Sequence, residues 1–159
     1  MTNSATLLWK SCLSVPYDTW YQMMLDLTGH PLYIKRVKGT PPIMRKIETQ
    51  MIAAINANKD WQSSNTSVHF DAETGVRVVR LHGNKIAEVA EDNDMTIFDG
   101  GWQTTTTKSR LNALCSEFCT TGEGVFQTDF VWYVRKFIGQ VGQNKYFRLD
   151  DFENGYCFA

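Results

Sequence analysis

The sequence has no apolar run long enough for a membrane-spanning helix and no excess of basic residues. A bilayer span takes about 18 or more consecutive apolar residues, and the apolar runs here are far shorter. The 16 Lys and Arg residues and 17 Asp and Glu residues leave a formal net charge of −1 at pH 7. Proteins that grip duplex nucleic acid without sequence preference carry a basic excess. The composition therefore argues against a membrane protein and against that binding mode, but it permits a local basic face.

Cysteine is scarce. The four cysteines, Cys12, Cys115, Cys119 and Cys157, lack the density of a disulfide scaffold, and no secretory signal peptide is recognisable. We therefore expect reduced thiols in a reducing cytoplasm. Cys115 and Cys119 are four residues apart, and His69 and His82 are the nearest further metal ligands, but no Cys-x-x-Cys or paired-histidine spacing completes a site. We expect no metal and no cofactor.

Sequence motifs of the common enzyme classes are also missing. There is no glycine-rich phosphate loop, serine elbow or paired-histidine motif. His82 and Cys115 could form a base–nucleophile pair, but no third residue is evident to orient them. A non-enzymatic protein is favoured, and a small enzyme is the less favoured alternative.

What the sequence does have is enough apolar residues for one globular domain. Of its 159 residues, 43% are hydrophobic and 13% aromatic, and a chain of this size buries a sizeable core without disulfides. Residues 1–43 differ in character from the rest. They predict short helices, one of them running from Pro16 through Met24 to Thr28, and end at Pro41-Pro42, a linker signal. We expect an N-terminal helical arm or extension over 1–43 and an α+β core domain over 44–159.

A run of strands follows the first core helix. Two β-branched stretches flank Gly83-Asn84, which suits a two-residue hairpin turn because glycine readily supplies a positive φ. The polar stretch from Asn58 to Asn65 is expected to be a loop. The predicted strands are Thr66–Asp71, Val76–Leu81, Ile86–Val89 and Met95–Phe98. Short polar turns between them favour an antiparallel meander.

Two amphipathic helices accompany the predicted strands. Met44–Asn58 places Ile47, Met51 and Ile55 on one face, with Glu48 among the outward residues. A second helix is expected to start within Thr104–Thr107. Its buried stripe is Leu111, Leu114, Cys115 and Phe118. Both helices should pack on one face of the sheet.

The chain after the second helix adds further strands. Val125–Arg135 is apolar on both sides and predicts one long strand that is central in the sheet or covered on both faces. The fold class expected is α+β: a mainly antiparallel β-meander of five or six strands with two helices packed on one face, plus the helical N-terminal arm.

Two segments carry a resemblance to known proteins. Leu81-His-Gly-Asn-Lys-Ile-Ala87 and Gly101-Trp-Gln-Thr-Thr-Thr-Thr-Lys-Ser-Arg-Leu-Asn-Ala-Leu114 resemble small accessory proteins encoded by tailed bacteriophages. The similarity covers roughly residues 44–135. It implies a phage accessory protein in the host cytoplasm, and it brings no activity, ligand or catalytic residue with it.

The polar start of the second helix is the strongest candidate for a binding site. A helix N-terminus presents unpaired amides and a partial positive charge, which suits a phosphate or carboxylate. An indole next to it could stack on a base. The candidate ligand-binding residues are Trp102, Thr104, Thr105, Thr106, Thr107, Lys108 and Arg110, with Arg135 and Lys136 as possible additions. In the structural alternative the threonines cap the helix, the indole closes the sheet, and the two cations are solvated.

Two classes of function stay open. The leading hypothesis is a phage-encoded, non-enzymatic binding protein that acts in the nucleic-acid metabolism of host or phage. The alternative is a protein-interaction module that inhibits a host enzyme or assembles with phage proteins. Nucleic acid and a host protein are thus both candidate partners, a membrane is not, and the sequence leaves the oligomeric state open.

Overall fold

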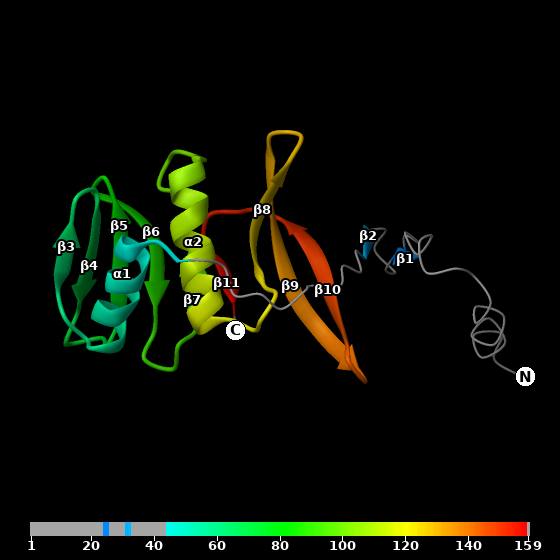
Figure 1. Cartoon of the computed structure of the whole chain (residues 1–159), viewed down its shortest axis with the longest axis horizontal. Helices are drawn as coiled ribbons and strands as arrows, with labels where there is room; N and C mark the ends of the chain where they lie inside the picture. Colours follow the sequence, from blue (N-terminus) through cyan, green and yellow to red (C-terminus); the bar gives the residue numbers. More distant parts are fainter. Residues whose placement is uncertain (1–23, 26–30, 33–43, 159) are drawn as a thin grey trace, which may run out of the picture.

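Residues 44–158 form two antiparallel sheets with a helix between them (Figure 1). The computed structural model describes residues 24–25, 31–32 and 44–158. Residues 44–158 contain the helices α1 (Lys46–Asn56) and α2 (Thr105–Phe118). The six-stranded sheet has the order β11 (Tyr156–Phe158), β7 (Met95–Ile97), β6 (Asn84–Val89), β5 (Arg77–Leu81), β4 (Thr66–Phe70), β3 (Trp61–Ser63). The three-stranded sheet has the order β10 (Asn144–Asp151), β9 (Val131–Val141), β8 (Gly124–Thr128). The predicted α+β class with mainly antiparallel strands is confirmed.

The six-stranded sheet buries one face only. Its strands pair so that Val68, Val79, Ala87 and Ile97 form a continuous row across β4, β5, β6 and β7, and all four are buried. Neighbours along each strand point to the other face, which is more open and polar. This alternation is typical of an antiparallel sheet with one solvated face.

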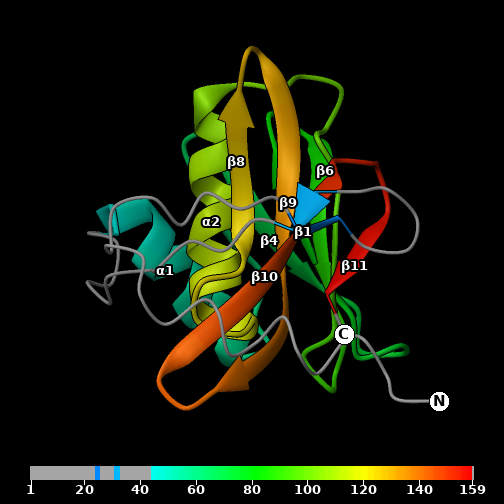
Figure 2. The ribbon, with the colours of Figure 1, turned by 90° about the vertical axis from the view of Figure 1, so that its right-hand side faces the viewer.

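Both helices cover the buried face of that sheet. Met51 and Ile55 of α1 and Leu111 and Leu114 of α2 are fully buried, which confirms the centre of each predicted apolar face. Ile47 and Phe118, near the helix ends, are only half-buried. On its other side α2 contacts β8, as Figures 1 and 2 show. The side chain of Asn112 completes this contact, since its amide donates to the Val125 carbonyl and accepts from the Val125 amide, both at 2.8 Å. Neither helix among the described residues has the length and apolarity that crossing a bilayer requires.

Glu48 is the main error of the helix prediction. The helical pattern predicts an outward position, yet Glu48 is 3% exposed and forms an ion pair with Arg110, 4% exposed, at 2.7 Å. Ser109 Oγ also donates to this carboxylate at 2.6 Å, and the Arg45 amide donates at 2.8 Å. Burial raises the pKa of Glu48, but these hydrogen bonds and the charge of Arg110 outweigh it and lower the pKa below its ordinary value.

The hairpin turn between β5 and β6 is one residue earlier than predicted. Leu81 pairs with Asn84, so the two turn residues are His82 and Gly83 rather than Gly83 and Asn84. Both have positive φ, 52° and 83°, as a type I′ turn requires. Histidine tolerates this backbone region better than β-branched residues do.

The stretch from Val125 to Arg135 is not one strand, contrary to the sequence prediction. It forms β8 and part of β9, joined by a two-residue turn at Asp129 and Phe130, which have φ values of 48° and 63°. The sequence signal was hidden because a phenylalanine occupies a turn position where glycine or asparagine is usual. The expected polar loop before β4 also differs, since Trp61–Ser63 forms the edge strand β3.

The N-terminal segment is described at two short strands. β1 (Met24–Leu25) pairs antiparallel with β2 (Pro31–Leu32). The helix predicted through Met24 is therefore wrong at that residue. The other parts of the predicted arm lie outside the described residues, and the boundary at residue 43 stays a prediction.

Candidate functional site

A groove of about 370 Å³ brings the start of α2 next to the β5–β6 turn. The residues that line it come from the turn, from the loop that precedes α2 and from the first turn of α2: Leu81, His82, Asn84, Ile86, Asp99, Gly100, Trp102, Thr104, Thr106 and Thr107. Trp102 is 72% exposed, so its indole does not plug the end of the sheet. Four of the predicted binding residues therefore line one surface depression.

The threonines divide into a capping pair and an available pair. Thr104 is the N-cap of α2, and its hydroxyl accepts from the Thr107 amide at 3.1 Å. Thr107 is buried and donates its hydroxyl to the Trp102 carbonyl at 3.0 Å. Among the described residues, the first-turn amides of Thr105 and Thr106 have no hydrogen-bond partner. The capping interpretation thus holds for Thr104 and Thr107, and Thr105 and Thr106 remain available for a ligand.

The basic residues of the prediction do not gather at this groove. Lys108 points to the other sheet and donates through Nζ to the Gln127 amide oxygen on β8 at 3.0 Å. Arg110 is buried and bonded to Glu48 and, through Nε at 3.3 Å, to the Thr66 hydroxyl. Its guanidinium therefore holds α1, α2 and β4 together, and it is neither solvated nor presented to a ligand.

Arg135 and Lys136 lie elsewhere, on β9 of the three-stranded sheet. Arg135 Nε donates to the Gly122 carbonyl, its guanidinium lies 5.4 Å from the centre of the Phe147 ring, and burial lowers its pKa. Lys136 Nζ lies 3.8 Å from a Glu123 carboxylate oxygen. Both cations have partners within the described fold and lie apart from the groove residues.

Sequence reasoning missed the hairpin side of the groove. His82 and Asn84 line it, and the exposed Arg80 donates through Nη1 to the Gly83 carbonyl at 3.4 Å, at the same turn. Gly100 permits the close approach, because its φ is 66° and a Cβ there would come within 3.0 Å of the Ile86 methyl. In the sequence, the glycine at position 100 was the signal that this loop packs closely on the hairpin.

Comparison with known proteins identifies the family. A model for the family described as "Kyanoviridae Gp96 protein" matches residues 44–159. The chain belongs to this family. The resemblance to phage-encoded proteins is thereby confirmed, while the family name specifies no activity. No curated protein and no solved structure matches the chain.

This Kyanoviridae family member has three free thiols among its described residues: Cys115 is buried, Cys119 half-buried and Cys157 exposed. A hydrogen bond with Cys119, together with burial, holds the pKa of the Cys115 thiol well above its ordinary value. Within the described part of the chain, no three His, Cys, Asp or Glu side chains come together as a metal site. Cys115 lies in the hydrophobic core, and Cys119 packs against it.

Proposed function

We propose that this phage protein is a non-enzymatic binding protein whose groove at Trp102 takes a single-stranded nucleic acid. The observation that carries the proposal is an indole that is 72% exposed on the rim of a polar groove. Base–indole stacking contributes about 1–3 kcal/mol per base and tolerates any sequence, because every base has a π-face.

The groove supplies hydrogen bonds around the indole. The hydroxyl of Thr106, the amide of Asn84 and the ring of His82 are of the kind that bind base edges and sugars. The free amides of Thr105 and Thr106 add a weakly positive helix start that suits one phosphate. Arg80 is the exposed guanidinium at the adjoining turn.

The proposed site has few cations, which fixes its expected salt dependence. With about two phosphate contacts, log K should fall with log salt with a slope of about −1.4 for a single strand. Binding should therefore depend more on stacking than on charge. A duplex, whose bases are already stacked, should bind less well than a single strand.

The test is a titration of the full chain with labelled single strands of about 12 nucleotides. Trp102→Ala should weaken binding by about 5- to 150-fold, the factor that 1–3 kcal/mol represents, and Trp102→Phe should retain part of it. Ile138→Ala removes an apolar side chain that is 49% exposed on β9, and it serves as the control that leaves binding unchanged. Absence of single-strand binding at low salt would refute the proposal.

A second candidate function, a protein-interaction module, is favoured by Phe130. This side chain is 93% exposed and its φ is 63°, a backbone region that costs a bulky residue about 1–2 kcal/mol. The neighbouring Val131 is 49% exposed. The fold gains nothing from a strained, solvated phenylalanine, and such residues are enriched at functional surfaces.

The β8–β9 turn and the start of α2 lie at the same end of the molecule, as Figures 1 and 2 show. Phe130→Asn separates the two candidate functions, since asparagine accepts this backbone. If the turn binds a protein, affinity capture from infected cells should recover a partner with wild type and lose it with Phe130→Asn. Oligonucleotide affinity should stay unchanged in that variant.

A further inference from the structure

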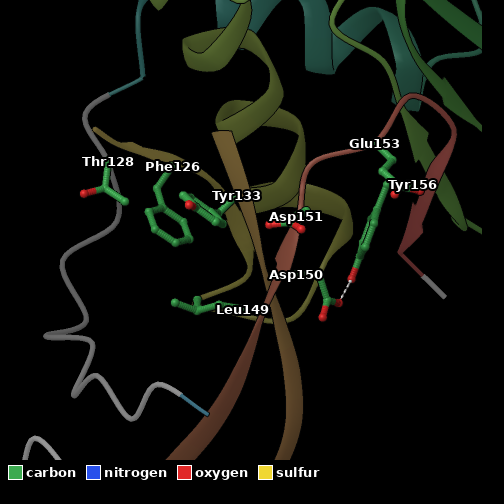
Figure 3. A pocket seen from close by; sticks show the side chains of 8 residues that line it. All are labelled: Phe126, Thr128, Tyr133, Leu149, Asp150, Asp151, Glu153 and Tyr156. Carbon is green, nitrogen blue, oxygen red and sulfur yellow. Dashed lines mark hydrogen bonds between the residues drawn. The ribbon is translucent and has the colours of Figure 1, made fainter. Parts of the chain in front are cut away.

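A second hollow, of about 490 Å³, lies between the three-stranded sheet and the segment from the end of β10 to β11, which contributes Glu153 and Tyr156 (Figure 3). Aromatic and acidic residues line it together. They are Phe126, Thr128, Tyr133, Leu149, Asp150, Asp151, Glu153 and Tyr156. None of the described residues that line it is basic, so this part of the surface offers apolar contact and negative charge. We call this hollow the acidic groove.

Strand register arranges three of these side chains in a row. Phe126 pairs with Tyr133, and Tyr133 pairs with Asp151, so the three lie on one face of adjacent strands. The Phe126 and Tyr133 rings are stacked, with centroids 5.6 Å apart and an interplanar angle of 24°. Strands lie about 4.8 Å apart, so Asp151 is one strand spacing from the Tyr133 of this stacked aromatic pair.

The carboxylates differ in how far they are already satisfied. Asp150 accepts two hydrogen bonds from Arg148, at 2.6 and 3.0 Å, and one from the Tyr156 hydroxyl at 2.6 Å. The carboxylates of Asp151 and Glu153 are exposed and bond no other described side chain. Within the described part of the chain, the groove thus has two carboxylates next to its aromatic rings that no cation pairs with.

We infer that the acidic groove binds a basic side chain, an arginine or lysine, from a segment of a partner protein. A guanidinium stacks on an aromatic face within about 6 Å of its centre and pairs with a carboxylate at its edge. The row of Phe126, Tyr133 and Asp151 presents both surfaces at that spacing. The volume accommodates one such side chain with its backbone.

The same sheet already shows this type of contact within the chain. The guanidinium of Arg135 on β9 lies 5.4 Å from the centre of the ring of Phe147 on β10. The inferred contact repeats that geometry with a cation from outside. It does not depend on nucleic-acid binding at Trp102, which is a different surface.

The probe is a short acetylated, amidated peptide with arginines spaced by glycines, titrated by calorimetry into the full chain at low salt. Its twin carries citrulline, which has the shape of arginine without the charge. We expect saturable binding of the arginine peptide and at least about tenfold weaker binding of the citrulline peptide. The double variant Asp151→Asn/Glu153→Gln should lose about tenfold in affinity, with its melting temperature unchanged.

Two further variants test the aromatic row and the specificity of the charges. Tyr133→Leu should lose about two- to fivefold in affinity, the value of an exposed cation–π contact, while Tyr133→Phe keeps the ring and the binding. Glu73→Gln/Glu91→Gln removes two exposed carboxylates from turns of the six-stranded sheet and should change nothing. Because Asp151 and Glu153 are surface residues, their variant stays interpretable even if Tyr133→Leu unfolds.

Three outcomes would overturn the inference. The first is equal affinity for the arginine and citrulline peptides. The second is wild-type affinity for the arginine peptide in Asp151→Asn/Glu153→Gln. The third is a loss of affinity in Glu73→Gln/Glu91→Gln as large as the loss in Asp151→Asn/Glu153→Gln. A fourth outcome, a gain in peptide affinity on neutralising Lys35, Arg36 and Lys38, would also overturn it, because the chain's own basic stretch would then occupy the groove. Oligonucleotide titrations on the same variants keep this result separate from the proposed function.

Discussion

Replacing Arg110 by alanine tests whether this residue stabilises the fold or binds a ligand. The sequence placed Arg110 among the ligand-binding residues, whereas the structure buries it to 4% exposure against Glu48. The variant would leave a buried carboxylate with only the Ser109 hydroxyl and the Arg45 amide as donors. We expect a large loss of stability and no direct effect on ligand contacts.

The size of the stability loss in Arg110→Ala follows from the burial of both Glu48 and Arg110. Removing one member of a buried ion pair costs about 3–5 kcal/mol, because the other charge stays desolvated. The two remaining hydrogen bonds to Glu48 and its ability to protonate place the estimate near the lower limit, about 3 kcal/mol. A folded unit of about 115 residues loses about 4 °C in Tm per kcal/mol. Arg110→Ala should therefore melt about 12 °C below wild type.

The assay is thermal and urea unfolding of Arg110→Ala beside a matched control. Lys85→Ala breaks the Lys85–Glu88 pair, which has the similar length of 2.8 Å but is 37% and 35% exposed, so it should cost less than about 1 kcal/mol. The double variant Glu48→Leu/Arg110→Met should be more stable than Arg110→Ala, since no charge is left buried. An Arg110→Ala protein that melts within about 2 °C of wild type but no longer binds oligonucleotides would refute this reasoning.

Three further predictions concern acid sensitivity, thiols and the N-terminal segment. The folded-state pKa of Glu48 lies below its ordinary value of 4.5. The ionised carboxylate therefore stabilises the fold fully above that pH, and this stabilisation is lost as the pH falls through the lowered pKa. The urea midpoint should fall between about pH 6 and about pH 3, and it should fall less in Glu48→Gln. With a thiol reagent, the exposed Cys157 should react before any other described thiol and the buried Cys115 only on unfolding; comparable rates for both in the native protein would contradict the packing. The fragment 44–159, the range of the family match, should unfold cooperatively by itself; a broad, non-cooperative melt would show that residues 1–43 belong to the core.

The sequence by itself determined the elements whose signal is local. The period-2 patterns of β4 and β5, the apolar stripe of α2 and the threonine N-cap are each written in a few consecutive residues. Their physical causes, alternation across a strand, helical periodicity and capping of free amides, act within one or two turns of chain. The α+β class followed from the order of these elements.

Where the local signal was ambiguous, the sequence prediction failed. Asp129 and Phe130 form a turn because β8 and β9 pair with each other and β8 is held by Asn112, a residue of α2. The turn of the first hairpin shifted to His82 and Gly83 because pairing of Leu81 with Asn84 set the register. Strand register is a property of two paired strands, so the sequence of one strand does not determine it.

Only the tertiary structure decided which polar residues are buried and which surfaces are available. Glu48 and Arg110 are separated by more than 60 positions and look solvent-facing on their own helices, yet each satisfies the other in the core. The same packing joined Trp102 to the His82 turn and aligned Phe126, Tyr133 and Asp151 across three strands. Burial of a charge depends on a compensating partner brought from a distant position, and that information lies in the packing of the elements.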